Sequence, residues 1–93
     1  MRVRDTQRVD THFRCDAHIP STVTEVVILD ISTTGCRLSV ESRMAQVGAT
    51  IILRLGDLRE ASGQIAWKQN AECGVVFHKP INTDLIDWIA AQS

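Results

Sequence analysis

The chain has 93 residues and a formal net charge of −1, from ten basic and eleven acidic side chains. This length suffices for one small domain with a modest core, and an apolar content of 44% is too high for a disordered chain. A nearly neutral molecule lacks the positive field with which nucleic-acid-binding and peripheral membrane proteins attract their partners, so any anion-binding site must be local.

The cysteines and the apolar runs bear on the compartment. There are three cysteines, and an odd number in a chain without a secretory signal favours the reducing cytoplasm over a disulfide scaffold. The longest apolar runs, such as Val26–Leu29, have the length of a strand and are too short to cross a bilayer. We therefore expect a cytoplasmic protein with no membrane insertion.

Alternation of apolar and polar residues predicts β-strands in the first half of the chain. Along His12–Ile19 the odd positions are apolar and the even positions are polar, as in a strand with one wet face. Pro20 interrupts this pattern, and a second, more apolar strand covers about Thr22–Ile31. The segment Ser32–Gly35 has the composition of a turn in which Gly35 is available for a positive φ.

Four further strands are predicted in the second half, followed by a helix. These strands are Cys36–Val40, Thr50–Leu55, Arg59–Lys68 and Cys73–His78. The first two are joined by Glu41–Gly48, for which we expect a connection with a turn of helix. After Pro80 the apolar residues repeat at helical spacing, which predicts a helix over about Asp84–Ala91 with Asn82 or Thr83 as its N-cap.

Six short strands separated by turns are typical of an antiparallel barrel or sandwich. At this length a closed barrel is favoured, because closure leaves no unpaired strand edge. We therefore predict a mainly β fold, a six-stranded antiparallel β-barrel with a C-terminal helix. In this single domain of residues 1–93, an N-terminal arginine arm occupies 1–11, the barrel 12–79 and the helix with its cap 82–91.

Two short motifs lie at the ends of predicted elements. Arg4 and Arg8 are four positions apart, just before the first strand. Asp30, Ser32 and Gly35 form a D-x-S-x-x-G pattern at the end of the second strand, and Asp30 comes 22 positions after Arg8. In this order and at this spacing the motifs resemble the signature of the PilZ family, which is RxxxR followed by [D/N]xSxxG.

The resemblance extends over nearly the whole chain. The segments Gly63–Trp67 and Gly74–Phe77 are similar to the GxVxW and GxxF strands of the family. PilZ domains are bacterial receptor domains for the second messenger cyclic di-GMP. The resemblance therefore implies a cyclic di-GMP-binding module without cofactor, metal or catalytic activity, coupled to an unidentified downstream protein. It also implies that all five residues of the two motifs contact the ligand.

The chemistry of these residues suits an anionic guanine dinucleotide. Arg4 and Arg8 can pair with phosphate or donate to guanine O6 and N7. Asp30 can accept hydrogen bonds from the guanine N1 and N2 groups, and the Ser32 hydroxyl can donate or accept nearby. Gly35 has no Cβ, so the backbone can approach a ligand closely.

Each motif also has a purely structural interpretation. Asp30, Ser32 and Gly35 could form a hairpin turn stabilised by their own side chains. Arg4 and Arg8 could belong to a solvated terminus. Both motifs together, in order and within a six-strand pattern, favour the ligand-binding interpretation.

Other candidate sites are weaker. Cys15 and His18 have the spacing of a metal-ligand pair, but residues three apart on a strand point to opposite faces. All three cysteines share the apolar phase of their strands, which is typical of small buried side chains. Trp67 and Trp88 are interpreted as packing residues, although Trp67 could border the site. No nucleophile motif is present, and we expect no enzyme activity.

Three classes of function remain to be compared. The first is a cyclic di-GMP receptor whose arginine arm closes over the nucleotide and creates a surface for a partner. The second is a nucleotide-independent adaptor of the same fold that acts through protein contacts alone. The third, a barrel that binds single-stranded nucleic acid, suits the fold but not the charge, so no nucleic-acid partner is expected.

Overall fold

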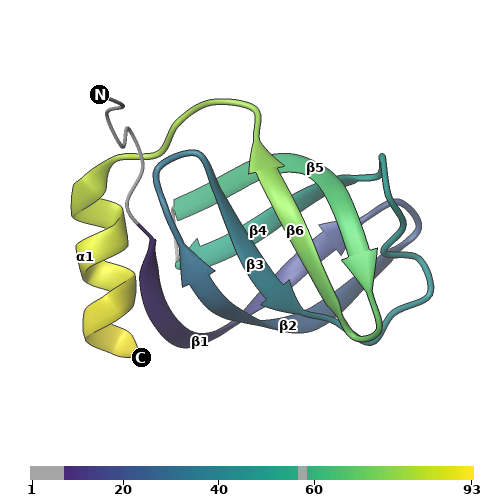
Figure 1. Ribbon diagram of the computed structural model, residues 1–93, viewed down its shortest axis with the longest axis horizontal. Helices are drawn as coiled ribbons and strands as arrows, with labels where there is room; N and C mark the ends of the chain where they lie inside the picture. Colours follow the sequence, from purple (N-terminus) through teal and green to yellow (C-terminus); the bar gives the residue numbers. More distant parts are fainter. Residues whose placement is uncertain (1–7, 57–58) are drawn as a thin grey trace, which may run out of the picture.

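Six antiparallel strands close into a barrel in the order β1-β2-β3-β6-β5-β4, and one helix follows them (Figure 1). The computed structural model describes residues 8–56 and 59–93. The elements are β1 (Val9–Ile19), β2 (Thr22–Ile31), β3 (Gly35–Ser39), β4 (Thr50–Gly56), β5 (Arg59–Gln69), β6 (Glu72–Phe77) and α1 (Thr83–Gln92). The predicted fold class, a six-stranded antiparallel barrel with a C-terminal helix, is confirmed.

The start of β1 differs from the prediction. The strand begins at Val9, not at His12, so residues 9–11 belong to the barrel and not to an arm. Val9 and Asp10 pair with the end of β2, and a β-bulge separates them from Phe13. The Thr11 hydroxyl donates to the carbonyl of Ile28 across the irregularity, at 2.7 Å. The bulge and the polar residues around it explain why alternation alone did not extend the strand to this point.

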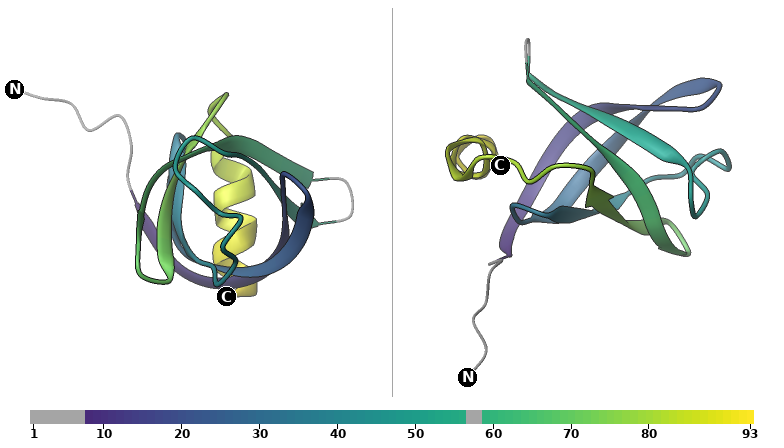
Figure 2. Two further views of the ribbon diagram at one scale, coloured as in Figure 1. Left: turned by 90° about the vertical axis from the view of Figure 1, so that its right-hand side faces the viewer. Right: turned by 90° about the horizontal axis from the view of Figure 1, so that it is seen from above.

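The connection between β3 and β4 contains no helical turn, contrary to the expectation for residues 41–48. Instead, the Ser42 hydroxyl accepts a hydrogen bond from the amide of Met44, at 3.0 Å, and the chain turns back. Ala45 is fully buried, whereas Met44 and Val47 are exposed. A single buried side chain cannot give a helix an apolar stripe, so this segment forms turns. It crosses the end of the barrel that lies opposite α1 (Figure 2).

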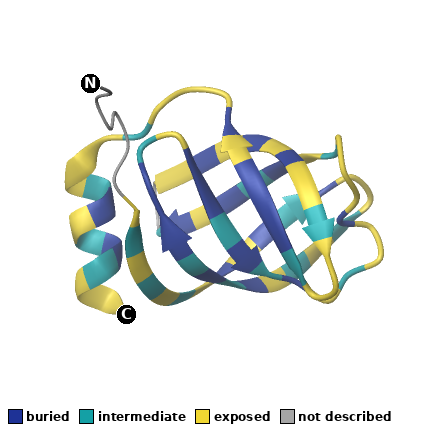
Figure 3. Cartoon of the chain, in the orientation of Figure 1, coloured by how far each residue is buried: buried dark blue, intermediate teal, exposed yellow. Residues whose placement is uncertain are grey.

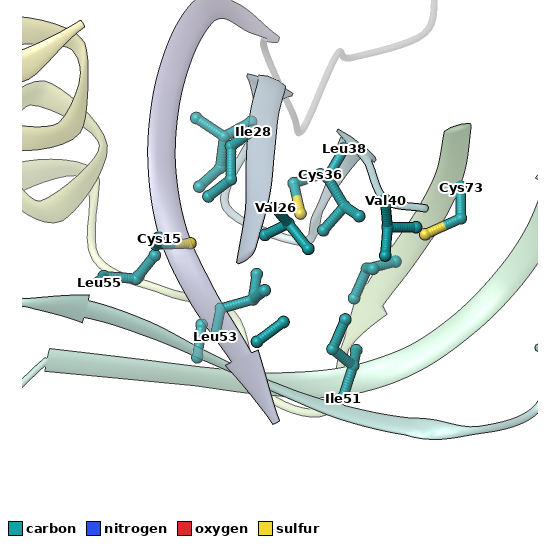
Figure 4. Close-up of a cluster of buried hydrophobic side chains, with 14 of the residues drawn as sticks. Cys15, Val26, Ile28, Cys36, Leu38, Val40, Ile51, Leu53, Leu55 and Cys73 are labelled. Atoms are coloured by element: carbon teal, nitrogen blue, oxygen red, sulfur yellow. The ribbon is translucent and has the colours of Figure 1, made fainter. Parts of the chain in front are cut away.

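The core fills the inside of the barrel with alternate side chains from every strand (Figures 3 and 4). Among its fully buried members are Ile28, Leu38, Ile51, Leu53 and Ile65. The three cysteines also lie in this core as free thiols, in agreement with their apolar phase. Burial raises the pKa of Cys15 to about 12 and that of Cys73 to about 11, and it also raises the pKa of Cys36, so these thiols stay protonated at neutral pH.

Helix α1 lies across one end of the barrel, next to β1 (Figure 2). Ile86 and Ile89 are buried, and Trp88 makes an edge-on contact with Phe13, with ring centroids 5.8 Å apart. The N-cap is Asn82, whose side chain accepts a hydrogen bond from the amide of Asp84 at 2.7 Å. Asn82 is one of the two residues that were predicted as the cap. Within the part of the chain that the structure describes, no helix is long and apolar enough to span a bilayer.

We predict that Ile28→Ala lowers the free energy of unfolding by about 2–5 kcal/mol, because it leaves a cavity at a fully buried core position. Urea denaturation followed by circular dichroism measures this loss. Val23→Ala is the matched control, since Val23 lies on the same strand and is 54% exposed; it should cost no more than about 0.5 kcal/mol. Equal losses in the two variants would contradict the assignment of the core.

Candidate functional site

A buried carboxylate, Asp30, lies at the end of β2 on the outside of the barrel wall. Only 11% of its side chain is exposed, and each carboxylate oxygen forms an ion pair with a different arginine. Arg8 Nη1 lies 2.6 Å from Oδ1, and Arg37 Nε lies 2.9 Å from Oδ2. Burying a carboxylate is costly unless it is paired and hydrogen-bonded, and the two arginines supply this pairing.

An irregularity in β2 determines which way Asp30 points. Ile28 pairs with Leu38, both buried in the core, and Asp30 pairs with Arg37 after a shift of register between the two pairs. Residues opposite each other in an antiparallel pair share a face, so Asp30 lies on the outer face with Arg37. Without the shift, Asp30 would have the same phase as Ile28 and would point into the apolar core.

Arg37 is held from two directions. Its Nε donates to Asp30, and its Nη1 donates to Glu72 Oε1 on β6 at 3.1 Å. The hydrogen bond to Asp30 and the charge of that carboxylate raise the pKa of Arg37, so the guanidinium stays charged. The site is therefore a chain of alternating charges, Arg8–Asp30–Arg37–Glu72, that runs across three neighbouring strands.

A cavity of about 290 Å³ opens beside this chain of charges. It is lined by Arg8, Asp30, Cys36, Arg37, Trp67, Gly74, Val75 and Val76. The cavity therefore combines two guanidinium groups, one carboxylate and one indole with apolar surface from β6. A planar ligand with a polar edge and a negative charge is the kind of molecule that such a lining can bind.

Trp67 lies at the cavity because β5 and β6 approach closely at this point. Trp67 pairs with Gly74 after a bulge in β5, and its side chain is on the exposed side of the barrel, 42% accessible. A Cβ at Gly74 would overlap the indole ring. Gly74 therefore allows the indole to lie directly on the β6 backbone.

The turn between β2 and β3 adjoins the cavity without lining it. The Ser32 amide donates to the carbonyl of Gly35 at 2.8 Å, and the buried Ser32 hydroxyl accepts from the amide of Thr34 at 3.3 Å. Gly35 does not have the positive φ for which it was considered. Its role is steric, because a Cβ there would overlap the carbonyl of Val75 on β6. The two residues thus shape the turn and bring β3 against β6.

The structure brings part of the predicted site together. Arg8 and Asp30 are in direct contact at the cavity, and Ser32 and Gly35 form the adjoining turn. Arg4 lies outside the described residues. Cys15 is buried in the core and His18 is only partly buried, on the other phase of β1. Within residues 8–56 and 59–93, no three His, Cys, Asp or Glu side chains gather as a metal site would require.

Three residues of the site, Arg37, Glu72 and Gly74, are not indicated as such by any local sequence pattern. Arg37 was visible only as a polar residue in the alternation of the third strand. Gly74 was noted in the G-x-x-F segment, but its partner could not be identified. Trp67, which was expected to pack or to border the site, lines the cavity.

A comparison of the sequence with models of known protein families gives a match that covers the barrel, the helix and both motifs. The family model of the PilZ domain matches residues 2–92, essentially the whole chain. The chain belongs to the PilZ domain family. No significant match was found among curated proteins. PilZ domains are receptor and adaptor modules.

We predict that Gly74→Ala displaces the Trp67 indole from β6, because the added methyl group overlaps the ring. In a Trp88→Phe background, where Trp67 is the remaining tryptophan, emission should shift to longer wavelength and quenching by acrylamide should increase. Val23→Thr, a substitution of similar size at an exposed position that does not line the cavity, should leave both signals unchanged. An unchanged spectrum in Gly74→Ala would contradict the contact.

Proposed function

We propose that this PilZ domain is a receptor for cyclic di-GMP that couples the level of the messenger to a downstream protein and catalyses no reaction. The observation that carries the proposal is the buried carboxylate of Asp30, which lies between two arginines at the mouth of a cavity lined by tryptophan. Because the messenger is bacterial and intracellular, the proposal includes a bacterial cytoplasmic location.

The cavity residues can meet each part of the ligand. The Asp30 carboxylate can accept from the N1 and N2 groups of a guanine, whereas adenine has no such pair of donors on the same edge. The exposed face of Trp67 offers a surface on which a base can stack. The volume of about 290 Å³ lies at the lower end of typical ligand sites, so we expect one guanine inside and the phosphates at the rim.

Ligand binding would exchange the partners of Arg8. The Arg8 side chain is 59% exposed, so water can solvate its guanidinium when it leaves the pair. Asp30 is only 11% exposed, so the N1 and N2 donors of the guanine must replace the hydrogen bond that Arg8 gives up. Once released, the guanidinium can bind a phosphate with two parallel hydrogen bonds. Arg4 is proposed as the second arginine of this motif, and Ser32 and Gly35 are proposed to hold the turn against the ligand.

A nucleotide-independent adaptor is the second candidate. It is favoured by the complete pairing of the Asp30 carboxylate with side chains of the protein itself. Both oxygens of Asp30 have arginine partners, and among the described residues no buried side-chain nitrogen or oxygen lacks a hydrogen bond. A site that is satisfied in this way can also be purely structural.

We predict that Arg8→Ala weakens cyclic di-GMP binding at least about tenfold, because a hydrogen bond to a charged group is worth about 1.5–3 kcal/mol and about 1.4 kcal/mol corresponds to tenfold. Isothermal titration calorimetry measures the affinity. Arg14→Ala is the matched control, because Arg14 is an exposed arginine of β1 that does not line the cavity. Unchanged affinity in Arg8→Ala would show that this arginine does not contact the ligand.

We predict that Asp30→Ala reduces the affinity for cyclic di-GMP more than that for cyclic di-AMP, because only guanine presents its N1 and N2 donors to the carboxylate. The same titration with both dinucleotides gives the ratio. Asp16→Ala is the control, since Asp16 is an exposed aspartate of β1 that does not line the cavity. Equal losses for the two ligands, or no loss, would make Asp30 a structural residue only.

A further inference from the structure

The two arginines that pair with Asp30 are anchored very differently. Arg8 precedes β1, and within residues 8–56 and 59–93 its side chain has one hydrogen-bond partner, Asp30. Arg37 lies within β3, directly opposite Asp30 in the register, and its guanidinium also donates to Glu72 on β6. Arg37 is therefore fixed by its strand and by two carboxylates, and it is the permanent partner of Asp30.

This asymmetry matters when a base enters the cavity. A carboxylate oxygen has two lone pairs, so Oδ2 can accept from Arg37 and from the ligand together. The bond from Arg37 Nε then keeps the plane of the Asp30 carboxylate fixed while Arg8 leaves Oδ1. Without Arg37, the carboxylate could rotate towards Arg8, and the remaining ion pair would compete with the ligand.

We infer that Arg37 is a positioning residue for guanine selectivity, which acts by holding Asp30, and that Glu72 in turn holds Arg37. This inference rests on the proposed function. The guanidinium of Arg37 has five N–H donors and uses Nε and Nη1 for Asp30 and Glu72. A direct contact between Arg37 and a phosphate is the competing interpretation, and the experiment must separate the two.

A double-mutant cycle makes this separation. Arg37→Ala should weaken cyclic di-GMP binding about fivefold, the size of a typical coupling between neighbouring side chains, and should reduce the preference over cyclic di-AMP. In an Asp30→Ala background the same change should have no further effect, because the residue through which Arg37 acts is absent. Calorimetric titration of the two single variants and the double variant with both dinucleotides measures the cycle.

Further variants test whether the hydrogen bonds of Arg37 to Asp30 and Glu72 are what matters for selectivity. Arg37→Lys keeps the charge but cannot place two fixed donors on Asp30 and Glu72, so it should not restore guanine selectivity. Glu72→Ala removes the acceptor of Arg37 Nη1 and should lower guanine selectivity in the same direction as Arg37→Ala. Arg54→Ala is the matched control, because Arg54 forms a similar exposed pair with Glu60 at 3.1 Å but does not line the cavity.

The outcomes distinguish the inference from the function on which it rests. If the unaltered protein does not bind cyclic di-GMP, the proposed function fails and the inference fails with it. If it binds, additive effects of Arg37→Ala and Asp30→Ala would overturn the inference and indicate a direct ligand contact. An unchanged affinity in Arg37→Ala would also overturn it. Thermal unfolding checks that each variant is folded, and Arg37→Gln replaces the alanine variant if that one is not.

Discussion

The outward direction of the Asp30 carboxylate is the constraint on which the rest of the site depends. The register shift after Ile28 turns this residue from the core face to the outer face of β2. A carboxylate that is still largely buried there needs positive partners, since an unpaired buried charge would destabilise the fold. Arg37 on the neighbouring strand and Arg8 before β1 meet this need, and the cavity opens beside them.

The sequence predicts most of the fold because each strand has one buried and one exposed face. Alternation predicts all six strands, and apolar residues at helical spacing predict the helix. Alternation fails where a bulge or a turn breaks the period. Asp10 lies beyond such a bulge, so the first strand was predicted too short. The connection around Ala45 was expected to contain a helical turn, but one buried alanine and two exposed apolar neighbours give turns instead.

Only some residues of the candidate site can be predicted from the sequence, because the others are brought together by strand pairing. Arg8 and Asp30 belong to short motifs, so local spacing identifies them. Arg37 meets Glu72, and Trp67 meets Gly74, only because β3, β5 and β6 pair in one particular register. Such pairings between distant segments depend on the closed barrel and leave no local pattern. Gly35 illustrates the same limit, since its importance comes from the β6 carbonyl beside it and not from its own φ.

The unequal anchoring of the two arginines also determines how much a ligand can gain. A nucleotide that binds Asp30 must compete with ion pairs that already exist, so only the difference between the old and new contacts contributes to affinity. The guanidinium of Arg8 is 59% exposed, so this partner can be exchanged provided that the ligand supplies donors to the buried carboxylate in its place. The bond from Arg37 comes from within β3, and Glu72 also holds this guanidinium, so under the proposed function it persists while Arg8 is exchanged. An arrangement with one exchangeable and one fixed partner suits a receptor, whereas two fixed partners would suit a purely structural ion pair.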